Sequence, residues 1–291
     1  MDFNKYYEDR QKLVNTFLEK RLEKKGISRV DEAMAYSLLA GGKRIRPIIL
    51  MATADALGVS GYNFLPVACG LEMIHTYSLI HDDLPCMDND DLRRGRPSCH
   101  KAFSESTAML AGDVLLTEAF EVIANASATP QICVAAARAL GAGAGSRGMV
   151  YGQELDLKYE ALAATEEQLR LIHRNKTGAL INAAVQMGAA AAGATPQQCK
   201  ILASYAYGLG LVFQIVDDVL DVTSTPEQLG KPIGSDSENG KTTFVTLYGT
   251  DGAMVLAQKL NEQICNDLQQ HFGAKAAFLQ QLAQQLLVRK N

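Results

Sequence analysis

The chain has 291 residues but no tryptophan, and its six cysteines show neither CxxC spacing nor a paired rhythm. A cysteine-based zinc site or a disulfide framework is therefore not expected. The net charge is only −4, which provides neither a basic arm for nucleic acid nor a polybasic membrane anchor. No apolar run reaches the roughly 20 residues of a membrane span, and the first residues lack the apolar core of a signal peptide. We expect a soluble, cytoplasmic protein that binds neither nucleic acid nor membrane.

Strand signals are nearly absent from the sequence, whereas helical periodicity runs through almost all of it. Hydrophobic residues make up 47% of the chain, which is enough to bury a large core. The expected helices cover about 3–25, 29–41, 45–58, 63–84, 99–126, 130–158, 165–192, 196–224, 242–247, 251–271 and 274–289. The sequence therefore predicts a single all-α domain over residues 1–291, a bundle of about ten or more helices.

One long segment, 225–241, interrupts the helical pattern. It is polar, contains glycine and proline, and directly follows an acidic cluster that ends at Asp221. Loops of this length in compact domains commonly serve function. We expect 225–241 to be a mobile active-site loop.

The first of two acidic clusters begins with Asp82 and Asp83 and reaches Asp88. Pro85 disfavours helix at the residue before it, so the preceding helix should end near Leu84. Asp82 and Asp83 then lie in the last helical turn, where the helix dipole disfavours carboxylates unless a cation is present. Sequences break such local rules mainly at functional sites.

The second acidic cluster lies inside a strongly apolar helix. Asp217 and Asp221 are four residues apart on one helical face, with Asp218 beside them. Like charges at this spacing destabilise a helix, and apolar surroundings make each charge costlier. Two such clusters, about 130 residues apart, are rarely both solvated surface acids. Oxygen ligands without histidine or cysteine point to Mg²⁺ or Mn²⁺ rather than zinc.

Basic residues accompany both acidic clusters. Lys43, Arg44 and Arg46 surround a glycine-flanked helix start, and Arg93 and Arg94 follow the first cluster. Arginine supplies bidentate contacts to phosphate, lysine supplies a point charge, and Mg²⁺ bridges carboxylates to substrate phosphates. Each cation alone is more often a solvated surface charge, but the set predicts a phosphate or diphosphate site. The cations that flank the second cluster are Lys176, Lys231 and Lys241.

At the level of whole motifs the sequence resembles the trans-type polyprenyl diphosphate synthases, and most closely the bacterial farnesyl diphosphate synthases. The resemblance extends over nearly the whole chain, and two aspartate-rich motifs in this order are highly specific. It rests on GGKRIRP (41–47), EMIHTYSLIHDDLPCMDNDDLRRGRP (72–97), HKAF and AMLAGDVLL (100–116), GQELDL (152–157), NKTGAL (175–180), FQIVDDVLD (213–221), GKPIGSD (230–236) and GKTT (240–243).

The resemblance implies an isoprenoid-synthase fold with helices around a deep central cavity, usually in a homodimer. It also implies three Mg²⁺ ions, with Mn²⁺ as a possible substitute, held on the diphosphate of an allylic substrate. The implied metal ligands and their supports are Asp82, Asp83, Asp88, Asp217, Asp218 and Asp221. The implied contacts to the allylic diphosphate are Arg93, Lys176, Thr177, Gln214, Lys231 and Lys241. The implied contacts to isopentenyl diphosphate are Gly42, Lys43, Arg46, His75 and Arg94.

The implied reaction condenses isopentenyl diphosphate with dimethylallyl and geranyl diphosphate to give (2E,6E)-farnesyl diphosphate. Mg²⁺ and the cations stabilise diphosphate as a leaving group, and isopentenyl diphosphate attacks the resulting allylic cation through its double bond. The family assigns the lost proton to the departing diphosphate. Because water would quench the cation, we expect an apolar cavity and a closing loop.

Product length is predicted from the helix that precedes Asp82. Tyr77 and Ser78 lie five and four residues before Asp82, about one helical turn along the path of a growing chain. Bacterial C15 enzymes have an aromatic residue at the position of Tyr77, whereas plant-type C20 enzymes often carry a smaller one. We therefore expect Tyr77, with Ser78, to form the floor that stops growth at C15, although ordinary core packing of Tyr77 remains the alternative.

Three other functions remain open at this point. A geranylgeranyl diphosphate synthase of the same family would share every motif. A class I terpene cyclase shares the helical bundle, but it usually replaces the second aspartate motif and needs no isopentenyl site. A regulatory subunit of a heteromeric prenyl synthase commonly lacks aspartates of the motifs, and none is lost here.

Overall fold

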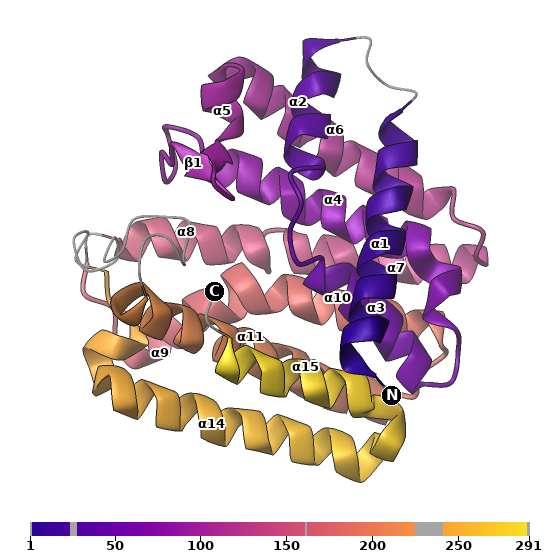
Figure 1. The fold of residues 1–291 in the computed structure, drawn as a ribbon, viewed down its shortest axis with the longest axis vertical. Coiled ribbons are helices and arrows are strands. Elements are labelled where there is room, and N and C mark those ends of the chain that lie inside the picture. The colour runs from indigo at the N-terminus through magenta and orange to yellow at the C-terminus, as the bar shows by residue number, and fades with distance from the viewer. Residues whose placement is uncertain (1, 24–27, 161, 225–240, 290–291) are drawn as a thin grey trace. The chain divides into compact units, whose positions relative to one another are not determined.

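The computed structural model describes residues 2–23, 28–160, 162–224 and 241–289, which are predominantly helical (Figure 1). The α-helices are α1 (Phe3–Leu22), α2 (Arg29–Leu38), α3 (Ile45–Ala56), α4 (Leu65–Asp82), α5 (Cys99–Ala102), α6 (Glu105–Ala124), α7 (Pro130–Ala144), α8 (Met149–Tyr159), α9 (Glu166–His173), α10 (Ala179–Ala191), α11 (Pro196–Thr223), α14 (Phe244–Phe272) and α15 (Ala277–Val288). Shorter turns are η1 (Gly61–Phe64), η2 (Arg174–Gly178) and η3 (Gly273–Ala276), and the strands are β1 (Leu92–Arg93) and β2 (Arg96–Pro97). The predicted all-α class is confirmed.

The chain divides into two compact units. Unit one comprises residues 1–51 and 60–137, and unit two comprises residues 52–59 and 138–291. Each unit buries a helical core of its own. The single-domain organisation over 1–291 stays a prediction, and the predicted loop at 225–241 lies, except for Lys241, outside the described residues.

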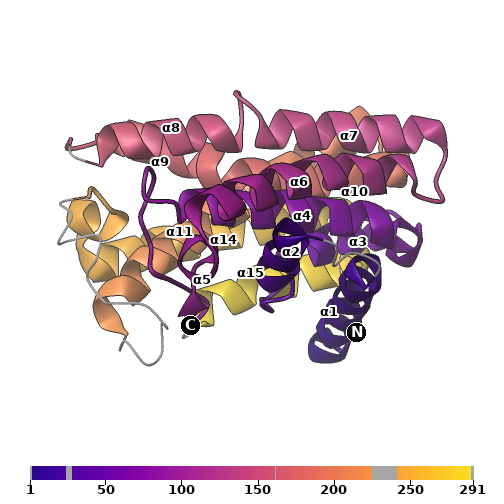
Figure 2. The same ribbon diagram turned by 90° about the horizontal axis from the view of Figure 1, so that it is seen from above.

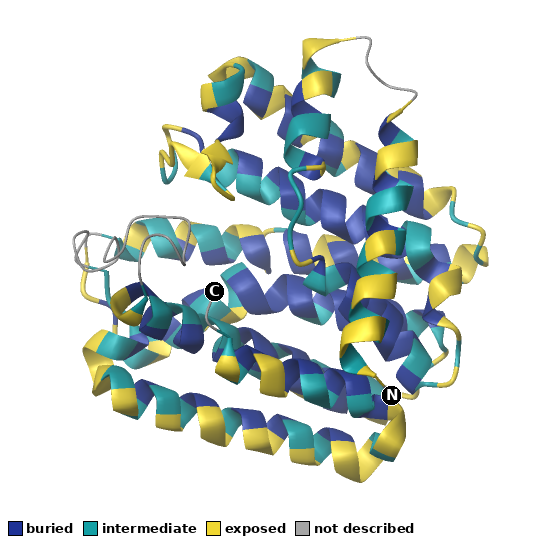
Figure 3. Cartoon of the chain, viewed as in Figure 1, coloured by how far each residue is buried: buried dark blue, intermediate teal, exposed yellow. Residues whose placement is uncertain are grey.

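The core of unit one is built around α4, which is apolar around most of its circumference and is buried along most of its length (Figure 3). Its main neighbour is α6, which runs beside it in both views (Figures 1 and 2). Gly70 permits this close approach, because a Cβ atom there would lie only 2.9 Å from the carbonyl oxygen of Ala119. The tight packing fixes the position of the acidic end of α4.

The core of unit two is built around α11, which packs against α10, α14 and α15. Apolar residues of α11 meet Phe244 at the start of α14, and Phe244 is fully buried. The hydroxyl of Tyr205, buried on α11, donates a hydrogen bond of 2.8 Å to the carbonyl oxygen of Leu279 on α15. The opposite face of α14 remains exposed (Figure 3). These contacts hold the aspartate-bearing half of α11 in a fixed setting.

Side-chain caps explain several helix starts. Ser28, Thr165, Thr195 and Thr243 each accept a hydrogen bond from the third residue of the helix that follows, within a complete capping box. The starts of α2, α9, α11 and α14, predicted from hydrophobic periodicity, agree with these capped starts to within two residues.

Two predicted helices are each divided in the structure, so their continuity was wrong. The helix expected over 99–126 breaks at Phe103, because Ser104 caps α6 by accepting a hydrogen bond of 3.1 Å from the Thr107 N–H. The helix expected over 130–158 breaks between α7 and α8, where Gly148 takes a non-helical conformation with φ −133° and ψ −125°.

Among the described residues, α11 is the one helix that is long and apolar enough to cross a membrane by length and composition. Half of its most apolar window is nevertheless buried in the structure. A core helix of this kind passes the same test, because helices buried in protein are apolar around most of their surface.

We predict that Tyr205→Phe lowers the free energy of unfolding by about 0.5–1.5 kcal/mol, because the buried hydrogen bond from the hydroxyl to the Leu279 carbonyl oxygen is lost. The urea midpoint, followed by circular dichroism, measures the change. Tyr62→Phe is the control, since Tyr62 is 58% exposed and its hydroxyl contributes little. Equal midpoints for Tyr205→Phe and the unmodified chain would contradict this role.

Candidate active site

The first acidic cluster forms at the carboxyl end of α4. The helix ends at Asp82, and Asp83 is its C-cap, so the predicted helix end is confirmed. The chain then turns back, and the Asp88 N–H donates a hydrogen bond of 2.9 Å to the carbonyl oxygen of Asp82. This turn brings Asp82 and Asp88, two of the carboxylate-bearing residues of the motif, next to each other at a helix terminus that attracts cations.

Asp83 is the more buried of the two adjacent aspartates, with 2% of its surface exposed. Its Oδ1 accepts hydrogen bonds from both Nε, at 2.9 Å, and Nη2 of Arg93. Burial raises the pKa of the Asp83 carboxyl, and the Arg93 guanidinium only partly offsets this. Asp83 therefore anchors Arg93 beside the cluster.

A short β-hairpin, which the sequence analysis did not predict, positions Arg93 and Arg94. Leu92 pairs with Pro97 and Arg93 with Arg96, so Arg94 and Gly95 form a two-residue turn. Both turn residues have positive φ, 55° and 72°, as two-residue hairpin turns require. The turn directs neighbouring arginines to different partners: Arg93 to Asp83, and Arg94 to the loop before α3.

The glycine loop before α3 receives Arg94. Gly41 and Gly42 have φ of 84° and 121°, which only glycine adopts readily. Arg94 Nη1 donates to the carbonyl oxygen of Gly41, and a Cβ atom on Gly42 would lie 2.6 Å from that same nitrogen. The missing side chain of Gly42 is therefore what makes room for the guanidinium.

His75 and Arg46 form the adjoining part of this cluster. Arg46 Nη1 lies 3.2 Å from His75 Nε2, and because arginine can only donate, His75 Nε2 is the acceptor. Burial, and then the positive charges of Arg46 and Arg94, lower the pKa of His75 well below its usual value. His75 is thus neutral at pH 7. Unit one brings Gly42, Arg46, His75 and Arg94 together, and their binding of one anion stays a prediction.

The remaining cations of the GGKRIRP motif behave differently from each other. Lys43 is exposed, and its backbone carbonyl accepts a hydrogen bond from the Tyr7 hydroxyl. Arg44, expected as a third cation around this helix start, is 3% exposed and points into the core instead. It donates to Glu72 Oε1 at 2.9 Å and to the carbonyl oxygen of Leu38 at 2.7 Å, so it stabilises the loop.

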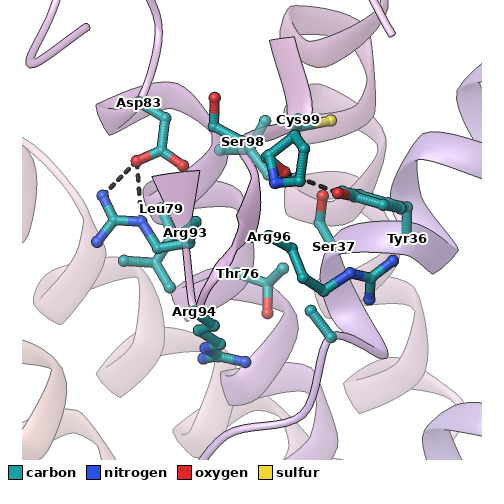
Figure 4. A pocket seen from close by; sticks show the side chains of 13 residues that line it. Tyr36, Ser37, Thr76, Leu79, Asp83, Arg93, Arg94, Arg96, Ser98 and Cys99 are labelled. Atoms are coloured by element: carbon teal, nitrogen blue, oxygen red, sulfur yellow. Dashed lines mark hydrogen bonds and ion pairs between the residues drawn. The ribbon is translucent and has the colours of Figure 1, made fainter. Parts of the chain in front are cut away.

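A pocket in unit one opens next to the same arginines (Figure 4). Its lining includes Asp83, Arg93, Arg94, Arg96 and Tyr36. Arg96 was not among the predicted site residues, and its guanidinium lies 4.2 Å from the centre of the Tyr36 ring. The pocket is therefore strongly basic with a single aspartate on its wall, a composition that suits an anion.

Unit two gathers a second set of predicted residues around η2, a π-helical turn inside the helix expected over 165–192. π-Turns of this kind are frequent at functional sites. This turn carries Lys176 and Thr177, and the Thr177 hydroxyl donates a hydrogen bond of 2.6 Å to Gln214 Oε1 on α11. Three residues predicted to bind one diphosphate are thus brought together.

Lys241 joins this set through Asp156 of α8. Lys176 Nζ lies 2.7 Å and Lys241 Nζ 3.9 Å from the same oxygen, Asp156 Oδ2. Asp156 was not predicted as a site residue, although the GQELDL motif that contains it supported the resemblance. Lys231 lies outside the described residues.

The three aspartates of the second motif have separate environments on α11. Asp217 Oδ1 accepts a hydrogen bond from Arg289 Nη2, and Asp218 Oδ2 accepts one of 2.7 Å from the Phe244 N–H at the start of α14. Asp221 is 3% exposed. Asp218 therefore fixes the start of α14, and its predicted role in supporting a metal ion stays a prediction.

Arg289 is a third residue, after Arg96 and Asp156, that was not predicted from the sequence. Its Nη2 also donates a hydrogen bond of 2.9 Å to the Phe213 carbonyl oxygen, and its guanidinium carbon lies 4.0 Å from the centre of the Phe213 ring. No local pattern reveals this contact, because Arg289 and Asp217 are 72 positions apart in the chain.

Tyr77 and Ser78 lie on α4 before Asp82. Tyr77 is 8% exposed, and its ring meets that of His81 edge-on with centroids 5.6 Å apart. The Ser78 hydroxyl donates a hydrogen bond of 2.8 Å to the His75 carbonyl oxygen of its own helix. Tyr77 is thus the bulkier of the two candidates for a chain-length floor.

The carboxylates in each unit have the donor chemistry that Mg²⁺ requires. Among the described residues, no group of three histidine, cysteine or acidic side chains is close enough to hold a metal ion by itself. Mg²⁺ is usually bound by one or two carboxylates together with substrate phosphates rather than by a cage of protein ligands. The adjoining Asp82 and Asp88 fit that mode of binding.

The chain as a whole matches a known family. A family model described as polyprenyl synthetase matches residues 27–282, most of the chain. The chain belongs to the polyprenyl synthetase family. The expected resemblance and the enzyme class, a polyprenyl diphosphate synthase, are confirmed.

Individual relatives include synthases of two product lengths. The chain is 46% identical to the farnesyl diphosphate synthase of Geobacillus stearothermophilus over 87% of this chain and 86% of that one. It is 44% identical to the chloroplastic geranylgeranyl pyrophosphate synthase of Capsicum annuum over 100% of this chain and 79% of that one. A solved structure of Helicobacter pylori geranyltransferase, complexed with magnesium and isoprenyl diphosphate, matches with a TM-score of 0.85 and 35% identity over 99% and 97% of the chains.

We predict that His173 makes the free energy of unfolding depend on pH. Its ring stacks on Phe244 with centroids 5.7 Å apart, and burial lowers its pKa to about 4. Between about pH 6.5 and pH 4 the unfolded chain therefore binds a proton that the folded chain does not. Lowering the pH through this range should reduce the free energy of unfolding by up to about 3 kcal/mol. His173→Phe keeps the stacking and should reduce this dependence.

Urea midpoints at pH 4.5 and pH 7.5 test this prediction. The difference between the two pH values should be smaller for His173→Phe than for the unmodified protein. The same difference in both proteins would show that another group is responsible.

Proposed function

We propose that the chain condenses isopentenyl diphosphate with dimethylallyl and geranyl diphosphate and releases (2E,6E)-farnesyl diphosphate. The observation that carries this proposal is the cluster of Arg46, Arg94 and neutral His75 around Gly42 in unit one. A synthase needs this anion site for its second diphosphate, in addition to the lysine-rich set around η2. A terpene cyclase, which takes a single diphosphate, does not.

Each proposed substrate is assigned its own group of binding residues. In this proposal Gly42, Lys43, Arg46, His75 and Arg94 bind isopentenyl diphosphate. Arg93, Lys176, Thr177, Gln214, Lys231 and Lys241 bind the allylic diphosphate. Asp82, Asp88 and Asp217 bind Mg²⁺, with Asp83, Asp218 and Asp221 in support. The hydrogen bonds of Asp83 to Arg93 and of Asp218 to the Phe244 N–H favour supporting roles for these two residues.

The chemistry begins when the allylic C–O bond breaks and its electron pair leaves on the diphosphate. The ammonium groups of Lys176 and Lys241 and the guanidinium of Arg93 stabilise the charge that develops there. The isopentenyl double bond then attacks the allylic carbon, and a proton leaves to the departed diphosphate. Because His75 is neutral and bound by Arg46, its role is to orient the isopentenyl diphosphate rather than to add charge.

Mg²⁺, when bound, neutralises the allylic diphosphate and strengthens it as a leaving group. The relative from Helicobacter pylori, with its bound magnesium and isoprenyl diphosphate, supports this assignment. We propose three ions, by resemblance to the family, together with a homodimeric assembly and a cytoplasmic location.

The proposed product is the C15 diphosphate because Tyr77 is a large, buried side chain one turn before Asp82 on α4. The competing candidate is a geranylgeranyl diphosphate synthase, since relatives of that kind also match the whole chain. The length of the prenyl product depends on the space beyond the allylic site. A single side chain there can therefore separate a farnesyl from a geranylgeranyl diphosphate synthase.

We predict that purified protein with Mg²⁺, isopentenyl diphosphate and geranyl diphosphate yields farnesyl diphosphate, and that EDTA abolishes this activity until Mg²⁺ is restored. Asp82→Ala and Asp217→Ala should each lower kcat by about 10³-fold or more, because leaving-group stabilisation is lost. Asp251→Ala, an exposed position on α14, is the matched control with unchanged kcat. Near-normal turnover in the two motif variants, or no condensation product in the unmodified protein, would contradict the proposal.

We predict that Tyr77→Ala shifts the main product to C20 or longer, because the buried ring no longer limits the tail. Product lengths are read by chromatography of the dephosphorylated alcohols. Tyr62→Ala, at a position 58% exposed, should leave the distribution at C15. A Tyr77→Ala enzyme that still makes only C15 would assign Tyr77 to core packing.

A further inference from the structure

Asp156 is a charged residue at the site that has no role in the proposed mechanism. It lies on α8 with 20% of its side chain exposed, and one of its oxygens contacts two lysines from distant segments. The ammonium groups of Lys176 and Lys241 are 2.7 Å and 3.9 Å from Asp156 Oδ2. Both lysines are proposed to bind the allylic diphosphate.

Backbone packing fixes Asp156 relative to Lys176. Gly152 lies one helical turn before Asp156 on α8, and a Cβ atom there would lie only 2.0 Å from the backbone nitrogen of Lys176. A side chain on residue 152 would overlap the backbone of Asn175 and Lys176, so α8 and η2 pack with their backbones in direct contact. Asp156, on the same face of α8, is thereby held directly at the lysine side chain.

The opposite charges of Asp156 and the two lysines hold these side chains together in the absence of ligand. Burial raises the pKa of the Asp156 carboxyl, but the ammonium groups of Lys176 and Lys241 outweigh it, so the pKa lies below its ordinary value. Asp156 is therefore ionised at neutral pH. Lys241 has a second partner, Glu160, at 3.1 Å, but Glu160 is more exposed at 37% and does not contact Lys176 in any described pairing.

We propose that Asp156 is a positioning residue that holds Lys176 and Lys241 together as a preformed receptor for the allylic diphosphate. The inference rests on the proposed function of that site. Two ammonium groups near one another repel, and long lysine side chains lose rotamer freedom when they are ordered. A fixed carboxylate that bridges both removes these costs before the ligand arrives.

Positioning and simple electrostatics predict opposite changes in diphosphate affinity when the charge of Asp156 is removed. A carboxylate near an anion-binding site repels the anion, so removing its charge alone should tighten diphosphate binding. If positioning dominates, removing the charge lets the two lysines disperse, and binding weakens. The sign of the change therefore separates the two accounts.

The experiment uses Asp156→Asn in the full-length protein, with Mg²⁺ held constant. We expect the KM for geranyl diphosphate to rise about tenfold, because the ligand must then order two flexible side chains itself. The KM for isopentenyl diphosphate, whose proposed contacts are all in unit one, should change by less than about twofold. Calorimetry with inorganic diphosphate should show a similar loss of affinity, of about tenfold.

Two further variants test whether Asp156 acts through lysine. Glu160→Gln removes the same charge from the more exposed partner of Lys241 and should weaken diphosphate binding by less than about twofold. In a Lys176→Met background, Asp156→Asn should have only a small additional effect, because one of the two side chains that it positions is already gone. Urea midpoints identify any variant that fails to fold.

Equal or tighter diphosphate binding in Asp156→Asn would overturn the proposal. So would the full tenfold effect in the Lys176→Met background, or a parallel rise in both KM values. Failure of the proposed function is a separate result: the unmodified protein would then form no condensation product. The calorimetric comparison with inorganic diphosphate would still decide the role of Asp156.

Discussion

The site depends on one physical constraint: a charge removed from water persists only where an opposite charge or a polar backbone group compensates it. Each unit meets the constraint with ion pairs between its own elements. Asp83 is paired with Arg93, Arg44 with Glu72, Asp156 with Lys176, and Asp217 with Arg289. These pairs divide into two kinds. The pair of Arg44 and Glu72 is 1–2% exposed and serves the fold, whereas the other pairs are partly open to solvent and hold groups that a ligand can engage.

The pairing also explains how one chain can handle highly charged substrates in apolar surroundings. In the proposed function a diphosphate with Mg²⁺ would bring both signs of charge, so binding would exchange ion-pair partners and leave few charged groups uncompensated. His75 shows the complementary solution. Surrounded by arginines, its ring stays neutral and accepts a hydrogen bond from Arg46, so it adds no further positive charge to the arginine cluster. Catalysis of this type depends on such prearranged dipoles and charges.

Much of the fold could be predicted from the sequence because helix signals are local. Hydrophobic periodicity marked the starts of several helices, and Pro85 marked the end of α4, to within a few residues. The hairpin at 92–97 and the break at Gly148 were missed because each depends on backbone conformation rather than on hydrophobic period. The motif residues were identified by their chemistry and by resemblance. Asp156 and Arg289 were not, because their partners lie 20 and 72 positions away.

The central claim is that one chain carries two distinct diphosphate sites, one built on Gly42, Arg46, His75 and Arg94 and one on Lys176, Thr177, Gln214 and Lys241. The most direct measurement is calorimetry in Mg²⁺ with a non-ionisable geranyl thiodiphosphate, followed by isopentenyl diphosphate on the saturated protein. The account predicts one molecule of each per chain, with isopentenyl diphosphate still binding when the first ligand is saturating. Competition of the two ligands for a single site would contradict it.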